Sequence, residues 1–409
     1  PVDLSTGSVG LGVAITAFSV LVQDYLVAHG SLDEADAGRM ISLMGDAELD
    51  EGNIYECLIE AYKHDIRNCW WVVDYNRQSL DSTTADRMFR RFDDIFETCG
   101  WRVVTLKNGK LQRAAFSRPG GKSLEDWIEN CPNADFAVLT YKGGAAWRER
   151  LIADIGGKPH VAKLLDSFDD DGLAALMTNL GGHCIESLMD AFDSADDERP
   201  TLFIAYTVKG YGLPLAGHKD NHSGMMNPAQ IEQLRASMGV DVGQEWEPFA
   251  GLGGNIAARL KDFVGQSVLA HKPQEPNAPA IAVPERLPVP SGDIQSTQSA
   301  FGNVLLDLAK SSETLADRIV TTAPDVTQTT NLGGFVNQRG LFRRSDVADI
   351  FRDAKIPSAQ KWAAHAAGQH IELGIAENNF FLLLTSLGLA APHFGTRLIP
   401  VGTVYDPFS

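Results

Sequence analysis

Short apolar runs alternate with amphipathic stretches over the first half of the chain, and this alternation predicts a parallel sheet covered by helices. Apolar runs bounded by polar turn residues are typical of buried strands. We expect such strands at residues 40–44, 70–74, 101–106, 136–139 and 201–208. We expect helices at residues 13–27, 51–66, 85–98 and 185–194.

A proline-rich stretch at residues 271–291 interrupts this pattern, and its composition is typical of a linker. A second α/β segment follows, with a helix expected at residues 299–310 and a strand at residues 318–322. The predicted fold class is therefore α/β, with two domains that each contain a mainly parallel sheet covered by helices. The two domains are expected at residues 1–240 and 297–409, joined by a helical and proline-rich linker at residues 241–296.

Polar side chains follow two neighbouring strands of the predicted first sheet. Asp46, with Ala47 and Glu48 beside it, comes directly after one apolar run, and Asn76 and Gln78 come after the next. A strand, a crossover helix and a second parallel strand bring both groups to the same carboxyl edge of a sheet, where open α/β sheets bind ligands. Carboxylate and amide oxygens suit Mg²⁺, which often shares its ligands with phosphate groups. The pattern therefore predicts a site for Mg²⁺ and a diphosphate.

Composition narrows the class of protein. The 409 residues, 44% of them hydrophobic, are enough for two or three domains with substantial cores. The net charge of −18 argues against a nucleic-acid or anionic-membrane partner. No apolar run reaches the roughly 20 residues that span a bilayer, and no secretory signal pattern is present. The five cysteines form no CxxC pair, so we expect a reduced, cytoplasmic setting without disulfides or structural zinc.

The spacing from Gly45-Asp46-Ala47 to Asn76, thirty residues after Asp46, resembles the diphosphate signature of thiamine-diphosphate enzymes. The surrounding sequence, residues 45–81, looks most like the homodimeric pyruvate dehydrogenase decarboxylating component of the transketolase superfamily. Ala47 departs from the family pattern, which has Gly there. The resemblance implies thiamine diphosphate and Mg²⁺ as cofactors, with Asp46, Asn76 and Gln78 as metal ligands and Ala47 and Glu48 beside the cofactor. It also implies that the chain is a central fragment, since the family has more residues before it and a further domain after it.

A second part of the resemblance concerns the catalytic carboxylate. Within residues 369–379, Glu377 matches the family's glutamate, and Glu372 is the competing candidate. A carboxyl group against a pyrimidine nitrogen promotes the tautomer of the cofactor that deprotonates its own thiazolium carbon. The alternative reading of Glu377 is a helix-terminal carboxylate that favours the helix dipole.

Four further residues match the family at other positions. His222 matches an active-site histidine that handles substrate protons, a task suited to an imidazole near neutral pH. Lys209 lies in a loop that resembles the one leading into the active site, and it could neutralise diphosphate charge. Tyr405 and Phe408 match the aromatics that pack on the aminopyrimidine. The alternatives are a solvated loop histidine, a solvated lysine and two core aromatics.

Three weaker matches complete the set. The Gly-rich turn at residues 6–12 resembles one that approaches the thiazolium and diphosphate, although a plain loop before a helix has the same composition. Asp325 matches an acidic position near the substrate. His183 lies in a glycine loop of the first domain, where we expect a structural role.

The resemblance implies an enzyme that oxidatively decarboxylates a 2-oxo acid, pyruvate by default, and passes the acyl group to the lipoyl arm of an acyltransferase. In the family the two cofactor-binding surfaces come from different subunits, so a homodimer is implied. The alternatives are a transketolase that moves a two-carbon ketol unit between sugar phosphates, and a non-catalytic cofactor-binding assembly subunit. Residues 48–56 and Gln78 favour the dehydrogenase type, and Glu377 argues against the non-catalytic subunit.

Overall fold

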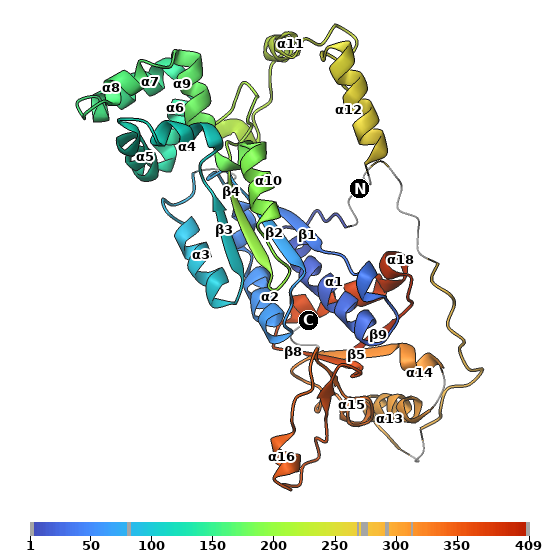
Figure 1. The fold of residues 1–409 in the computed structure, drawn as a ribbon. Helices are drawn as coiled ribbons and strands as arrows, with labels where there is room; N and C mark the ends of the chain where they lie inside the picture. The colour runs from blue at the N-terminus through green and yellow to red at the C-terminus, as the bar shows by residue number, and fades with distance from the viewer. Residues whose placement is uncertain are drawn as a thin grey trace.

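Two fully parallel sheets form the framework of the protein (Figure 1). The structure is a computed structural model that describes residues 4–79, 83–267, 270, 277–290, 294–311 and 314–405. The first sheet has the strand order β1-β2-β4-β3, and the second has the order β7-β6-β8-β5-β9. This arrangement confirms the predicted α/β fold class with two helix-covered parallel sheets.

The strands of the first sheet lie close to their predicted positions. They are β1 (Met40–Gly45), β2 (Cys69–Tyr75), β3 (Arg102–Leu106) and β4 (Thr201–Tyr206). The strand expected at residues 136–139 was wrong, because this segment lies inside helix α6 (Asn133–Lys142). Its two buried side chains, Phe136 and Leu139, are three positions apart and so point to one face of a helix. A run this short has no clear period that separates a strand from a buried helix.

Helices cover the first sheet and extend it at one end. Those against the strands are α1 (Leu11–Ala28), α2 (Gly52–Lys63), α3 (Phe89–Thr98) and α10 (Ile185–Asp193). Beyond β3 and β4, at the upper left of Figure 1, lies a helical cap of α4 (Lys110–Phe116), α5 (Gly121–Asn130), α6, α7 (Gly144–Ile155), α8 (Val161–Leu165) and α9 (Asp170–Thr178). The 3₁₀ turns in the described residues of this half are η1 (Glu34–Asp36), η2 (Asp46–Asp50), η3 (Gly181–His183) and η4 (Lys219–His222).

Helix α1 is the most apolar long helix in the described part of the chain. With 18 residues and a mean hydropathy of 1.7 it could cross a membrane by length and composition alone. The sequence pattern did not predict a helix that could cross a membrane. Here 67% of it is buried, and it packs against β1, α2 and the second domain. Its apolar surface is therefore accounted for by the protein core.

The segment between the sheets is extended. Helices α11 (Pro228–Ser237) and α12 (Gly254–Gln266) bury none of their side chains and project from the top of the view in Figure 1. Residues 277–290 of the proline-rich stretch form no helix or strand. The remaining residues of that stretch lie outside the described part of the chain.

The second sheet has shorter strands. They are β5 (Ile319–Pro324), β6 (Leu341–Phe342), β7 (Ala364–His365), β8 (His370–Leu373) and β9 (Ile399–Gly402). The accompanying helices are α13 (Thr297–Lys310), α14 (Thr314–Arg318), α15 (Gly333–Arg339), α16 (Ile350–Asp353), α17 (Glu377–Gly388) and α18 (Ala390–Phe394). The predicted helix at 299–310 and strand at 318–322 are both confirmed.

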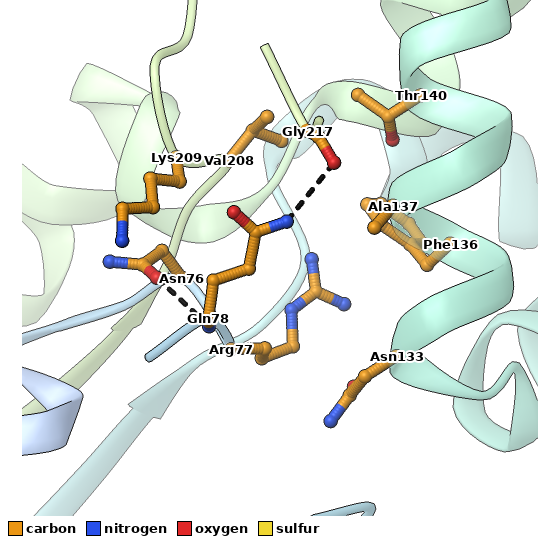
Figure 2. Close-up of a pocket in the computed structure, with 10 residues that line it drawn as sticks. All are labelled: Asn76, Arg77, Gln78, Asn133, Phe136, Ala137, Thr140, Val208, Lys209 and Gly217. Atoms are coloured by element: carbon orange, nitrogen blue, oxygen red, sulfur yellow. Dashed lines mark hydrogen bonds between the residues drawn. The ribbon is translucent and has the colours of Figure 1, made fainter. Parts of the chain in front are cut away.

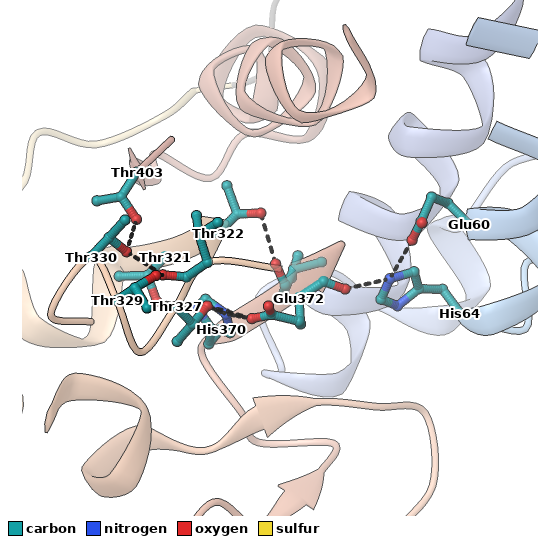
Figure 3. Close-up of polar contacts among 12 residues, drawn as sticks. Glu60, His64, Thr321, Thr322, Thr327, Thr329, Thr330, His370, Glu372 and Thr403 are labelled. Atoms are coloured by element: carbon teal, nitrogen blue, oxygen red, sulfur yellow. Dashed lines mark hydrogen bonds and ion pairs between the residues drawn. The ribbon is translucent and has the colours of Figure 1, made fainter. Parts of the chain in front are cut away.

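The two halves share one hydrophobic core, because α17 packs on α1 and α2. Polar contacts reinforce this junction. The Gly374 N–H donates to Oε1 of buried Glu60 at 2.9 Å, and the His64 ring nitrogen Nε2 lies 3.2 Å from the Glu372 carbonyl oxygen (Figure 3). Burial lowers the pKa of His64 to about 3, so this ring is neutral at physiological pH.

Candidate active site

The ends of β1 and β2 bring the two predicted polar groups to one edge of the first sheet. These strands are parallel neighbours, with Gly45 opposite Asp74, so both chains leave the sheet side by side. Asp46 is buried at the start of η2, and its Oδ2 accepts a 2.8 Å hydrogen bond from the main-chain N–H of Arg77. Arg77 has a φ of 66°, the left-handed conformation that turns the chain sharply after β2. The expected juxtaposition at the carboxyl edge is therefore confirmed.

The environment of Asp46 disfavours its charge in the absence of a cation. Burial raises the pKa of this carboxyl group to about 6, and the nearby Asp74 charge adds to the effect. The N–H groups of Arg77 and Ala47 and the Lys209 ammonium act in the opposite direction. A divalent cation at this edge would shift the balance to the ionised carboxylate, as metal binding does for its acidic ligands.

Asn76 and Gln78 flank Arg77, whose N–H binds Asp46, but their own side chains have other partners (Figure 2). Oδ1 of Asn76 accepts from the Gln78 main-chain N–H at 3.0 Å, and Nε2 of Gln78 donates to the Gly217 carbonyl at 3.0 Å. Both residues, with Lys209, line a small cavity of about 10 Å³, close to the space of one water molecule. Asp46 does not line this cavity.

The donor set fits a magnesium ion better than a softer metal. The described residues contain no group of three or more His, Cys, Asp or Glu side chains that could hold a metal. What they offer is the single Asp46 carboxylate and amide oxygens, which are hard ligands suited to Mg²⁺ with phosphate and water completing the shell. Oε1 of Gln78 is buried and has no hydrogen-bond partner among the described residues. An unpartnered buried oxygen next to an ion-sized space is consistent with a cation ligand.

Glu48 holds the Gly-rich turn against the strand end. Its Oε2 accepts from the Gly10 N–H at 3.0 Å, and its Oε1 accepts from the Gly45 N–H at 3.1 Å. Gly10 has a φ of 79°, and a Cβ there would lie 2.8 Å from the Glu51 Cβ, so glycine is required at this close approach. Glu48, which is predicted to bind the cofactor, thus links residues 6–12 to the end of β1, and Ala47 lies half-buried beside it.

The loop after β4 carries Lys209. Its Nζ donates to the Ser79 carbonyl at 3.2 Å, which places the ammonium next to the Asn76 loop. The Val208 N–H donates to Nε2 of His183 at 2.8 Å, and the His183 ring stacks on Tyr211 with 3.8 Å between centroids. His183 therefore orients this loop, in line with the structural role expected for it.

The two candidate glutamates of the second domain have different surroundings. Glu372 on β8 contacts His370 and Thr327 in a polar cluster (Figure 3). Glu377 opens α17, is half-buried and forms no hydrogen bond to any described residue. Burial raises the pKa of Glu56 on α2, and the nearby charge of Glu377 adds to the effect. Of the two carboxylates, Glu377 is the one left available for a ligand.

The remaining predicted residues are at the surface or outside the described part. His222 ends η4 and is exposed, and Asp325 follows β5 and is also exposed. Tyr405 is 37% exposed. Phe408 lies outside the described residues. The structure does not bring His222 into a hydrogen bond with any other candidate residue in the part of the chain that it describes.

Sequence reasoning missed two residues at this site. Arg77 lies between the predicted ligands Asn76 and Gln78 but is not itself among the predicted site residues, yet its side chain is buried and its N–H binds Asp46. Gly217 supplies the carbonyl that orients Gln78 from 139 positions away. An arginine next to a predicted buried strand end was the only available sign of the first, and nothing in the sequence marks the second.

Comparison with known proteins supports the resemblance. The chain is 23% identical over 98% of its length to the pyruvate dehydrogenase E1 component of Pseudomonas aeruginosa, covering 47% of that protein. It is 26% identical over 56% of its length to the Escherichia coli K12 protein of the same name, covering 26% of it. No family model matches the chain. The chain spans about half the length of the curated relatives that it matches from end to end.

Solved structures agree on the fold. The transketolase of Campylobacter jejuni superposes with a TM-score of 0.53 and 14% identity, over 98% of this chain and 48% of its own. The transketolase of Leishmania mexicana gives a TM-score of 0.54 and 16% identity over the same shares. The fold is thus that of the transketolases. Together with the sequence relatives it confirms the resemblance to the thiamine-diphosphate transketolase superfamily seen in the sequence. Within it, the sequence relatives named here are pyruvate dehydrogenase E1 components.

Proposed function

We propose that this chain contains the diphosphate-binding and pyrimidine-binding domains of a thiamine-diphosphate-dependent 2-oxo-acid dehydrogenase. The reaction is oxidative decarboxylation of a 2-oxo acid, pyruvate by default, with acyl transfer to a lipoyl group. The expected assembly is a homodimer that works with a lipoyl-bearing acyltransferase, in the cytoplasm. Similarity to pyruvate dehydrogenase E1 components over 98% of the chain supports this choice within the superfamily.

The observation that carries the proposal is the shared edge of β1 and β2. Asp46 is fixed there by the Arg77 N–H, while Asn76 and Gln78 follow the adjacent strand. In this role Asp46, Asn76 and Gln78 hold Mg²⁺, and Lys209 balances diphosphate charge. Glu48 keeps the Gly-rich turn against the same edge.

The second domain contributes the proton-handling group. When bound, thiamine diphosphate supplies the nucleophile and the electron sink for decarboxylation. Glu377 holds a proton at a pyrimidine ring nitrogen, a role that needs a carboxyl group free of internal partners. His222 transfers substrate protons, and Tyr405 and Phe408 pack on the aminopyrimidine. Glu372, tied to His370 and Thr327, supports β8 instead.

Calorimetric titration of the 409-residue chain with thiamine diphosphate tests the cofactor site. We expect saturable binding with Mg²⁺, and loss of binding with a chelator or in an Asp46→Ala variant. Asp94→Ala is the matched control, because it removes a carboxylate that is 74% exposed on α3 and is not among the predicted site residues. Absence of binding by a chain whose circular dichroism shows the α/β fold would contradict the proposal.

A substrate panel then separates the dehydrogenase from its rivals. We expect carbon dioxide release from 2-oxo acids, with pyruvate among those accepted, and reduction of an added lipoyl domain. Turnover of ketose phosphates with an aldose acceptor, and none of 2-oxo acids, would identify a transketolase. Cofactor binding without turnover of either class by the dimer would identify an assembly subunit.

A further inference from the structure

A second, larger cavity lies next to the small cavity beside Gln78, and Arg77, Asn133 and Phe136 line both. Its volume is about 280 Å³, and it lies between the ends of β2, β3 and β4 and the helical cap. We call it the Arg77 cavity. Its walls include the aromatic rings of Tyr75, Phe89, Phe136 and Tyr206. Asp46, Asn76 and Gln78 do not line it, so it is separate from the predicted metal ligands, although it shares Arg77 with the smaller cavity. A space of this size accommodates a small organic molecule.

The guanidinium of Arg77 is a buried charge without a counter-ion among the described residues. The residue is 9% exposed, and no carboxylate in the described part of the chain forms an ion pair with it. Its Nε is buried and has no hydrogen-bond partner among the described residues. The one side-chain hydrogen bond that it forms to a described residue is a long 3.5 Å contact from Nη2 to the Thr207 carbonyl. Its carbon Cζ lies 4.2 Å from the Phe136 ring centroid and 5.6 Å from that of Tyr206.

Burying an unpaired guanidinium costs free energy unless a ligand in the cavity binds it. Stacking on Phe136 recovers part of the lost hydration, but a planar guanidinium has five N–H donors and few are used here. Buried charges in proteins are normally paired. The partner that matches an arginine fork best is an oxyanion, which accepts two parallel hydrogen bonds.

The other charges around the cavity select the kind of anion. Lys107 is already paired with Glu129, with 2.9 Å between Nζ and Oε2. Asp86 accepts from the Asn133 N–H at 2.9 Å, and Arg87 donates to Asn130 at 2.9 Å. The lining therefore has three cations and two carboxylates. One excess positive charge matches a monoanion better than a phosphate dianion, and the aromatic walls favour an apolar or planar body.

We propose that the Arg77 cavity binds a small organic monocarboxylate with a planar apolar body, its carboxylate on the Arg77 guanidinium and its body between the rings of Phe136 and Tyr206. This ligand is separate from the cofactor and from the reacting substrate. Because the Arg77 N–H also holds Asp46, an occupant of the cavity acts directly on the loop that presents Asn76 and Gln78.

Calorimetry with benzoate as the probe tests the proposal on the whole chain. We expect one saturable site, present both without cofactor and after saturation with thiamine diphosphate and Mg²⁺. Arg77→Gln is expected to weaken binding at least tenfold, which is the loss of a charge-assisted bidentate contact. Arg91→Gln is the matched control and should bind as the parent does, because its side chain is 78% exposed on α3 and outside the cavity.

A second variant keeps the test decisive if Arg77→Gln does not fold. Asn130 is exposed at the cavity wall, so Asn130→Trp leaves Arg77 intact and should block entry. Benzoate binding that survives in both variants would overturn the proposal, as would its displacement by thiamine diphosphate. Binding of inorganic phosphate in place of benzoate would overturn the monocarboxylate assignment. Benzoate titration of the cofactor-free chain does not depend on the proposed function. Failure of the cavity proposal can therefore be distinguished from failure of the proposed cofactor site.

Discussion

The main-chain N–H of Arg77 donates a 2.8 Å hydrogen bond to Oδ2 of Asp46, and this bond joins the ends of two adjacent parallel strands. Two substitutions at position 46 can therefore separate the effect of the Asp46 charge from the effect of this hydrogen bond. Asp46→Asn keeps an oxygen for the Arg77 N–H but removes the charge, so we expect loss of Mg²⁺-dependent thiamine-diphosphate binding with the fold intact. Asp46→Ala also leaves a buried N–H unpaired, which should lower the free energy of unfolding by about 1–3 kcal/mol. Calorimetry and urea unfolding measure the two effects. Equal unfolding free energies for the two variants would contradict this assignment of the bond.

Asp46 should also give the metal-free chain a pH-dependent stability. Its folded pKa of about 6 lies above the 3.8 that is usual for an aspartate, so between these values the folded state binds more protons than the unfolded state. Its contribution to the free energy of unfolding therefore falls as pH rises from about 4 to about 6 and is constant above, a total of roughly 3 kcal/mol at 1.36 kcal/mol per pKa unit.

Urea unfolding of the metal-free chain at pH 4.5 and pH 7 tests this slope. The difference in stability between Asp46→Asn and the parent should move in favour of the variant as pH rises, because the variant has no carboxylate to ionise. Burial also raises the pKa of Asp24 to about 6, but Asp24 is present in both chains and cancels from the difference. Parallel pH profiles for the two chains would show that Asp46 ionises normally. Added Mg²⁺ should stabilise the parent most above pH 6, where the carboxylate is ionised.

The edge of the first sheet could be predicted because it depends on local pattern and on one rule of parallel topology. The apolar runs before Asp46 and Asn76 mark strands, and parallel strands end at the same edge. The orientation of Gln78 could not be predicted, because the Gly217 carbonyl that holds it comes from a loop 139 residues away. The burial of Arg77 could not be predicted either, because its stacking partner Phe136 was expected on a strand but lies on α6. Both contacts join segments that are far apart in the sequence, so no local pattern marks them.

Glu377 and Glu372 should respond differently to the same isosteric change. Glu377→Gln removes the proton-holding group of a residue without internal hydrogen bonds to described residues, so we expect unchanged stability, retained cofactor binding and a loss of turnover of at least a hundredfold, the usual scale for a general acid–base group. Glu372→Gln disturbs the contacts to His370 and Thr327 and should instead lower the unfolding free energy by about 1–3 kcal/mol. Turnover and urea unfolding of both variants distinguish the roles. The reverse pattern would assign the catalytic carboxylate to Glu372.

Glu48 should affect cofactor binding without being a ligand. It accepts from the N–H groups of Gly10 and Gly45, so Glu48→Ala leaves two donors unpaired and frees the Gly-rich turn from the strand end. We expect a loss of about 1–3 kcal/mol in unfolding free energy, and thiamine-diphosphate binding that is weaker but still depends on Mg²⁺. Glu48→Gln keeps one acceptor oxygen and should lie between the parent and Glu48→Ala in both measurements. A metal ligand would behave differently: both variants would abolish the Mg²⁺ dependence, as Asp46→Asn is expected to do. Titrating each variant with Mg²⁺ at fixed cofactor therefore separates a residue that positions the turn from one that holds the ion.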